Sequence, residues 1–103
     1  MSTIKIRLKR QDNVTLIRLL IAHPMETGRK KDKNTGQLVP AHFIKEVKIE
    51  YKDKLVASCE FTTGVSRDPY LSLRLKNGQT GDLVKVSWVD NLGQTDSEMA
   101  AIP

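Results

Sequence analysis

Ile4-Lys5-Ile6-Arg7-Leu8-Lys9 is the stretch that decides the fold, because its residues alternate strictly between apolar and basic side chains. Successive side chains of a β-strand point to opposite faces of the sheet. The alternation therefore predicts a strand whose apolar residues face a core and whose basic residues face solvent.

Six further segments have strand patterns, and turn sequences such as Lys52-Asp53, Asn77-Gly78 and Asn91-Leu92-Gly93 separate them. The segments are Val14–His23, Phe43–Tyr51, Leu55–Phe61, Leu71–Leu75, Val84–Trp88 and Gln94–Ile102. About seven short strands without a convincing helix predict an all-β, immunoglobulin-like antiparallel β-sandwich. At 103 residues, the whole chain, residues 1–103, is expected to form a single domain.

The segment Val14–His23 is unusual because it is apolar on both faces, with Leu16 and Leu20 on one side and Ile17 and Leu19 on the other. Such a strand is either central in the sandwich or covered by a partner. On an isolated monomer, a second apolar face would be an exposed patch.

Residues 24–40 form the one long segment without a strand pattern, and unpatterned loops of this length are usually functional or disordered. The segment contains the basic run Arg29, Lys30, Lys31 and Lys33. Most such runs are solvated loops, but this one could also attract an acidic partner. Both interpretations of the segment stay open.

The net charge of +5 is compatible with nucleic acid, an anionic membrane surface or an acidic protein as partner. Aromatic residues make up only 5% of the chain, so platforms for stacking bases are scarce. No apolar run is long enough to span a membrane. The N-terminus has no signal-peptide core, which taken alone indicates the cytoplasm.

Few residues offer reactive chemistry. Cys59 cannot form an internal disulfide, and its alternation places it on an apolar face with Leu55 and Phe61, where a thiol resists ionisation. His23 and His42 flank the long segment and could form a metal pair. A zinc site needs three or four ligands, and Glu26 is the one further candidate nearby. We therefore favour hydrogen-bonded histidines, and expect no catalytic residue, cofactor or metal.

Four segments carry a resemblance to a known family. They are His23-Pro24-Met25-Glu26-Thr27-Gly28 followed by Arg29-Lys30-Lys31-Asp32, then Gly36, Pro40 and Ile44, then Asp68-Pro69-Tyr70, and then Trp88-Val89-Asp90-Asn91-Leu92-Gly93. In this order, over nearly the whole chain, they resemble the SoxZ family. Two departures, Lys52-Asp53 for a more usual Asn-Gly and Asp68 for Asn, are compatible with turns.

The resemblance implies a non-catalytic subunit of SoxYZ, the heterodimeric sulfur carrier of thiosulfate oxidation. In that family, SoxY carries sulfur intermediates on the cysteine of a C-terminal arm, which other Sox enzymes visit. This chain ends Ala-Ala-Ile-Pro without such a cysteine. It would stabilise SoxY and help present the arm, meeting the other Sox enzymes transiently. The family works in the periplasm, with SoxZ exported together with SoxY.

The surface expected to meet SoxY is the apolar strand and the segment that follows it. The candidate interface residues are Leu16, Arg18, Leu20, His23, Met25, Glu26, Arg29 and Lys30. Two alternatives remain: a basic β-domain that binds nucleic acid, and a small enzyme or metal protein using His23, His42 and Cys59. The leading hypothesis involves neither nucleic acid nor a membrane.

Overall fold

Seven β-strands and no helix make up the described part of the chain, which in this computed structural model is residues 3–103 except 27, 30, 62–66 and 77. The strands are β1 (Ile4–Gln11), β2 (Val14–Ile21), β3 (Ile44–Tyr51), β4 (Lys54–Glu60), β5 (Tyr70–Leu75), β6 (Leu83–Asp90) and β7 (Thr95–Ala101). The predicted all-β architecture is confirmed. In the part described, no helix exists that could cross a bilayer.

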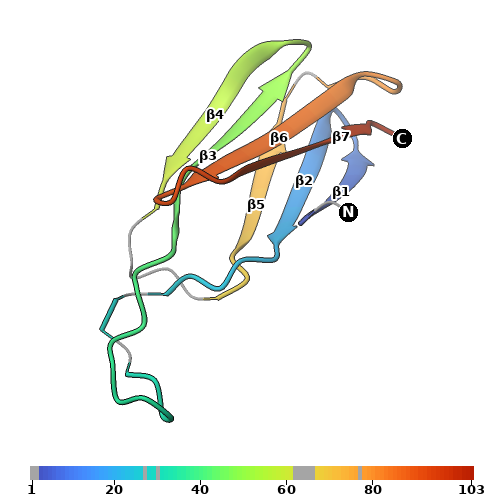
Figure 1. Ribbon diagram of the computed structural model, residues 1–103. Helices are drawn as coiled ribbons and strands as arrows, with labels where there is room; N and C mark the ends of the chain where they lie inside the picture. Colours follow the sequence, from blue (N-terminus) through green and yellow to red (C-terminus); the bar gives the residue numbers. More distant parts are fainter. Residues whose placement is uncertain (1–2, 27, 30, 62–66, 77) are drawn as a thin grey trace.

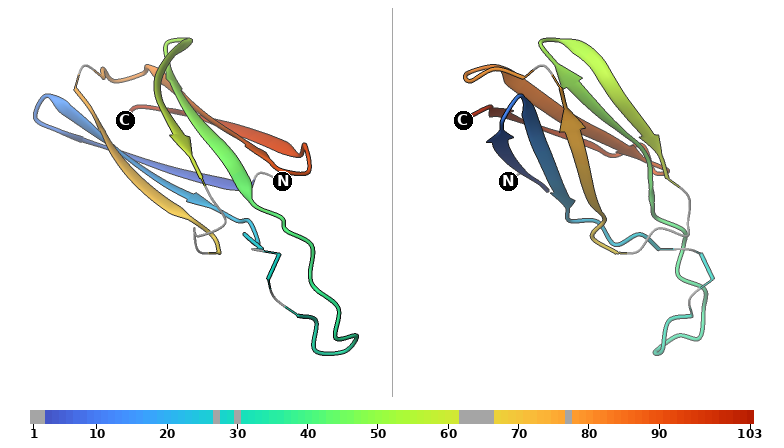
Figure 2. Two further views of the ribbon diagram at one scale, coloured as in Figure 1. Left: turned by 90° about the vertical axis from the view of Figure 1, so that its left-hand side faces the viewer. Right: turned by 180° about the vertical axis from the view of Figure 1, so that it is seen from behind.

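Two antiparallel sheets face each other, as Figures 1 and 2 show: a three-stranded sheet in the order β1-β2-β5 and a four-stranded sheet in the order β4-β3-β6-β7. The arrangement is the immunoglobulin-like sandwich that the sequence predicts. The turn between β3 and β4 places Lys52 and Asp53 at φ of 51° and 62°. Two successive positive φ values are typical of a type I′ hairpin turn, so this prediction is confirmed too.

The core lies between the sheets and is built from alternate residues of facing strands. Its buried apolar side chains are Ile4, Ile17, Leu19, Ile21, Met25, Ile44, Val47, Ile49, Val84, Val86, Trp88 and Ile102. Ile102, just beyond β7, lies at the end of the core beside Asp82. Its N–H donates a hydrogen bond to the carbonyl oxygen of Asp82 (2.9 Å).

β4 departs from the predicted alternation. Ala57 and Cys59 are partly buried against the core, as expected, but Leu55 is 57% exposed. The reason is a register shift: Ala57 is opposite Ile49, whereas Leu55 is opposite Glu50, the very next residue of β3. This bulge reverses the inward and outward positions along the strand. Placing Leu55 on the apolar face was therefore wrong.

Between β2 and β3, the described residues of 24–43 leave the sandwich as a projecting arm, which Figures 1 and 2 show extending from one end. The arm helps to give the molecule principal-axis extents of 53 × 24 × 22 Å. β2 ends at Ile21, two residues earlier than predicted, and β3 begins at Ile44, one residue later. The three extra residues are Ala22, His23 and Phe43, of which His23 and Phe43 lie at the base of the arm.

Candidate functional site

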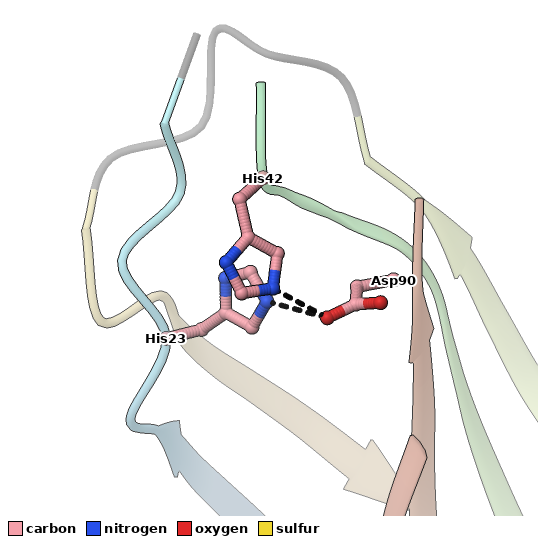
Figure 3. A group of neighbouring side chains, drawn as sticks. All are labelled: His23, His42 and Asp90. Carbon is pink, nitrogen blue, oxygen red and sulfur yellow. Dashed lines mark hydrogen bonds and ion pairs between the residues drawn. The ribbon is translucent and has the colours of Figure 1, made fainter. Parts of the chain in front are cut away.

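His23, His42 and Asp90 meet where the arm joins the sandwich, and we call them the histidine–aspartate cluster (Figure 3). His23 follows β2, His42 precedes β3, and Asp90 is the last residue of β6. Oδ2 of Asp90 lies 3.2 Å from Nε2 of His23 and 2.7 Å from Nε2 of His42. His23 and Asp90 are buried and His42 is partly buried. Three separate segments are therefore joined through one carboxylate oxygen.

The other carboxylate oxygen of Asp90 shapes the turn between β6 and β7. Oδ1 accepts hydrogen bonds from the N–H groups of Leu92 (3.0 Å) and Gln94 (2.8 Å). Burial alone would raise the pKa of Asp90, but the hydrogen bonds from His23, His42 and the two backbone groups outweigh it and hold the pKa below its usual value. Asp90 is thus a buried carboxylate that is stabilised in its ionised form.

The proton position on His23 follows from its backbone contact. The N–H of Met25 donates to Nδ1 of His23 at 3.1 Å. A backbone N–H can act only as donor, so in the neutral ring Nδ1 is the acceptor and Nε2 carries the proton, which it donates to Asp90. The ring also packs edge-on against His42 and Trp88, with centroid distances of 4.5 and 5.2 Å.

This tautomer bears on the alternative of a metal pair. The nitrogen and oxygen ligand atoms of the cluster lie within 4.8 Å of one another, with Asp90 rather than Glu26 as the third group. To bind a metal through Nε2, a neutral His23 would have to carry its proton on Nδ1, facing the N–H of Met25. Ligating histidines normally donate that second N–H to an acceptor. The donor set therefore does not fit a resident metal and is suited to fixing the chain.

The base of the arm is held from both sides. Glu26 and His42 exchange two backbone hydrogen bonds of 2.6 and 3.0 Å. The side chain of Asn91 accepts from the N–H of Phe43 and donates to the carbonyl oxygen of Ala41, both at 2.8 Å. Residues 31–38, farther out along the arm, are exposed. The result is a firmly anchored base and a solvated tip.

The candidate interface residues fall into three groups. Leu16, Arg18 and Leu20 lie on the outer side of β2, the middle strand of its sheet. His23 and Met25 are buried at the base of the arm, so in this conformation neither offers surface to a partner, and both support the arm instead. The third group lies in the arm. Glu26 is partly buried and Arg29 is exposed, whereas Lys30 lies outside the described residues.

Sequence reasoning found the two histidines but missed their shared partner. Asp90 continues the period-two pattern of Val84, Val86 and Trp88, all of which are buried. An aspartate on the buried side of a strand needs hydrogen-bond donors to offset its desolvation. That pattern, together with the presence of two histidines beside the arm, was the signal from which the cluster could have been predicted.

The outer side of the β1-β2-β5 sheet forms a second feature, which we call the basic face. Its residues are Lys5, Arg7 and Lys9 of β1, Leu16, Arg18 and Leu20 of β2, and Tyr70, Ser72 and Arg74 of β5. Their cross-strand register makes three rows: Lys5 with Leu20 and Tyr70, Arg7 with Arg18 and Ser72, and Lys9 with Leu16 and Arg74. Basic and apolar side chains are thus interleaved on the outer side of one sheet.

A comparison with protein-family models matches residues 4–101 to the family described as "Sulphur oxidation protein SoxZ". The chain belongs to the SoxZ family. The match runs from the start of β1 to the end of β7 and includes the arm and the histidine–aspartate cluster. The resemblance carried by the four sequence segments is confirmed, and it places the chain in a family of sulfur oxidation. A comparison with curated protein sequences found no match.

Solved structures with a similar fold include superoxide reductases. The enzyme from Nanoarchaeum equitans has a TM-score of 0.70 at 12% identity, over 98% of this chain and 92% of that one. The neelaredoxin from Ignicoccus hospitalis has a TM-score of 0.68 at 16% identity, over 97% and 78%. A hypothetical protein from Pyrococcus horikoshii OT3 has 0.70 at 13%, over 98% and 88%. At these identities the likeness concerns the fold alone.

Proposed function

We propose that this SoxZ-family chain is the non-catalytic subunit of the SoxYZ sulfur carrier in thiosulfate oxidation. It would form a heterodimer with SoxY, stabilise it, and help present its cysteine-bearing arm to other Sox enzymes. The supporting observation is how the histidine–aspartate cluster is used. Nδ1 of His23 accepts a hydrogen bond from the backbone of the arm, and Oδ1 of Asp90 accepts two from the β6–β7 turn. Oδ2 of Asp90 links the two histidine rings. The cluster is thereby suited to shaping a surface.

The thiol of Cys59 supports the same division of labour. Cys59 lies in β4 opposite Val47 of β3, and its side chain is partly buried against the core. A sulfur carrier that is visited by several enzymes needs its thiol on an accessible, movable segment. In the proposed complex, that segment belongs to SoxY.

Co-expression with SoxY tests the proposal. Size-exclusion chromatography with light scattering should give one peak with the mass of a one-to-one complex, and SoxY should unfold at a lower temperature when it is purified without this chain. Two separate peaks, each with the mass of a single subunit, would contradict the proposal. Catalysis of a sulfur-transfer step by the isolated chain would contradict its non-catalytic part.

A periplasmic location, reached by export together with SoxY, belongs to the same proposal. Fractionation of cells that express both proteins should place this chain in the periplasm. Deleting the signal peptide of SoxY should then leave both proteins in the cytoplasm. A chain that reaches the periplasm equally well without SoxY would overturn co-export.

The basic face favours a second candidate function, binding of nucleic acid. Phosphate contacts by Lys and Arg would give an affinity that falls steeply as salt increases. Fluorescence anisotropy with labelled single-stranded and double-stranded DNA at low salt tests it. Micromolar binding that disappears at higher salt would favour this function, and a flat titration would remove it.

A further inference from the structure

We infer that the basic face is the docking surface for a protein surface on which acidic groups alternate with apolar groups. The inference rests on the proposed function, because it assigns this occupant to SoxY. Figure 2 shows the sheet that carries the face in front in its right-hand view, with β2 between β1 and β5. The arm leaves from the end of this sheet, so that a partner on the face would lie beside the arm's base.

Charge is divided unequally between the two sheets. The strands of the β1-β2-β5 sheet carry six Lys and Arg residues and no Asp or Glu. The strands of the β4-β3-β6-β7 sheet carry four Lys residues and six Asp and Glu residues. The positive charge of the sandwich strands is therefore concentrated on one sheet, and five of its six basic residues are on the basic face. Such a field attracts and orients an acidic partner surface.

The arrangement of these charges does not serve the stability of the isolated chain. Arg7 and Arg18 are directly opposite each other on neighbouring antiparallel strands. Like charges in this position are destabilising, and the next residue in the same row, Ser72, carries no charge to offset them. Carboxylates of a partner placed over the row would remove the repulsion. The pair is thus explained by binding and not by folding.

Apolar groups in the rows on either side of the Arg7–Arg18 row distinguish a protein partner from nucleic acid. Leu20 is 40% exposed and Tyr70 is 59% exposed, and they are neighbours across β2 and β5. They line a shallow hollow together with Lys5, Arg7 and Arg18. Trp, Tyr and Arg are enriched among the residues whose truncation costs the most binding energy at protein interfaces. Phosphate backbones would engage the charges but would leave Leu20 and Leu16 without apolar contacts.

A single charge reversal tests the inference with two readouts of opposite sign. Arg18→Glu replaces the repulsive pair with an attractive one, so the isolated chain should become slightly more stable in thermal unfolding. Its affinity for SoxY should nevertheless fall by at least about tenfold, because it places a carboxylate against an acidic surface. Lys85→Glu is the control for affinity alone: it changes the net charge equally on the outer side of the other sheet, where it is opposite Glu50 and should lower stability slightly. Its affinity should stay within about twofold of wild type.

Two further variants test the exposed apolar residues of the basic face. Leu20→Ser with Tyr70→Ser should weaken binding to SoxY by at least about tenfold. The control, Leu83→Ser with Met99→Ser, removes comparably exposed side chains, at 49% and 48%, from the other sheet. It should leave the affinity for SoxY unchanged. Biolayer interferometry at low and high salt gives the affinities. Arg7→Glu repeats the charge test should Arg18→Glu fold poorly.

The outcomes separate the inference from the proposed function. If the wild-type chain does not bind SoxY, the proposed function fails and this assignment fails with it. If it binds and the variants on the basic face bind equally well, only the inference is overturned. Binding of DNA by the wild-type chain that Arg18→Glu abolishes would also overturn the inference, since nucleic acid would then be the occupant.

Discussion

Asp90 and His23 are buried, and nearly every polar atom of their side chains has a defined hydrogen-bond partner. The pair therefore tolerates little change. In Asp90→Asn, the amide must turn its oxygen toward the N–H groups of Leu92 and Gln94 or toward the histidines. In either orientation, its NH₂ group faces another donor. His42 can shift its proton to relieve the conflict, but His23 cannot, because Met25 donates to Nδ1.

Asp90→Asn should therefore lower the free energy of unfolding by about 2–4 kcal/mol, the range for a broken buried network. Urea unfolding followed by circular dichroism measures it. Asp53→Asn is the control, because Asp53 is exposed and Asn tolerates its positive φ. A loss at position 90 no greater than that of the control would show that the cluster does not stabilise the fold.

The stability of the protein at acidic pH depends on the carboxylates of Asp90 and Asp96. Hydrogen bonds from the N–H and then from the hydroxyl of Thr3 hold the pKa of Asp96 below its usual value, and the pKa of Asp90 is lowered as well. A group whose pKa is lower in the folded state stabilises the protein above its unfolded pKa of about 4. This contribution is lost as the pH falls through the folded pKa.

The free energy of unfolding should consequently decrease as the pH is lowered from about 5 toward 2. Asp96→Asn should be less stable at pH 5 and should show a shallower decrease. Urea unfolding at a series of pH values provides the comparison. Parallel curves for the wild type and the variant would contradict the assignment to Asp96.

At the level of elements, the arm is anchored by Asn91 as well as by the cluster. Its side chain holds the N–H of Phe43 and the carbonyl oxygen of Ala41. Asn91→Ala should lower the free energy of unfolding by about 1–2 kcal/mol. The Phe43 amide should also exchange its hydrogen faster, while amides in the middle of β3 keep their protection.

Hydrogen exchange followed by NMR resolves these amides individually. Asn34→Ala, at the exposed tip of the arm, is the control and should leave both quantities unchanged. Unchanged exchange at Phe43 in Asn91→Ala would mean that the backbone pairing of Glu26 with His42 holds the base without Asn91.

The strands themselves were predictable because burial on one face imposes a period of two on the sequence. The alternation of β1 and β6 gave their inward faces residue by residue. The exposure of Leu55 was not predictable from alternation, because a bulge changes which side chains face inward without interrupting the apolar pattern. Of the cluster, the two histidines were identified as candidates for a shared site, but Asp90 was missed. Contacts between residues as far apart in sequence as His23 and Asp90 depend on how the strands are ordered in the sheets.

As a whole, the molecule is a two-sheet sandwich with one basic face and one anchored arm, and its single thiol lies against the core. If SoxY carries the sulfur, Cys59→Ser should leave the thiosulfate-dependent sulfur load of the complex unchanged within about 10%, since the hydroxyl is of similar size at a partly buried site. Intact-mass spectrometry of the two subunits, separated after incubation with the upstream Sox enzymes, measures where the sulfur resides. The matched control is the Cys→Ser variant of the SoxY arm, which should lose its load entirely. Stoichiometric persulfide on Cys59 in the complex would instead assign the carrier role to this chain.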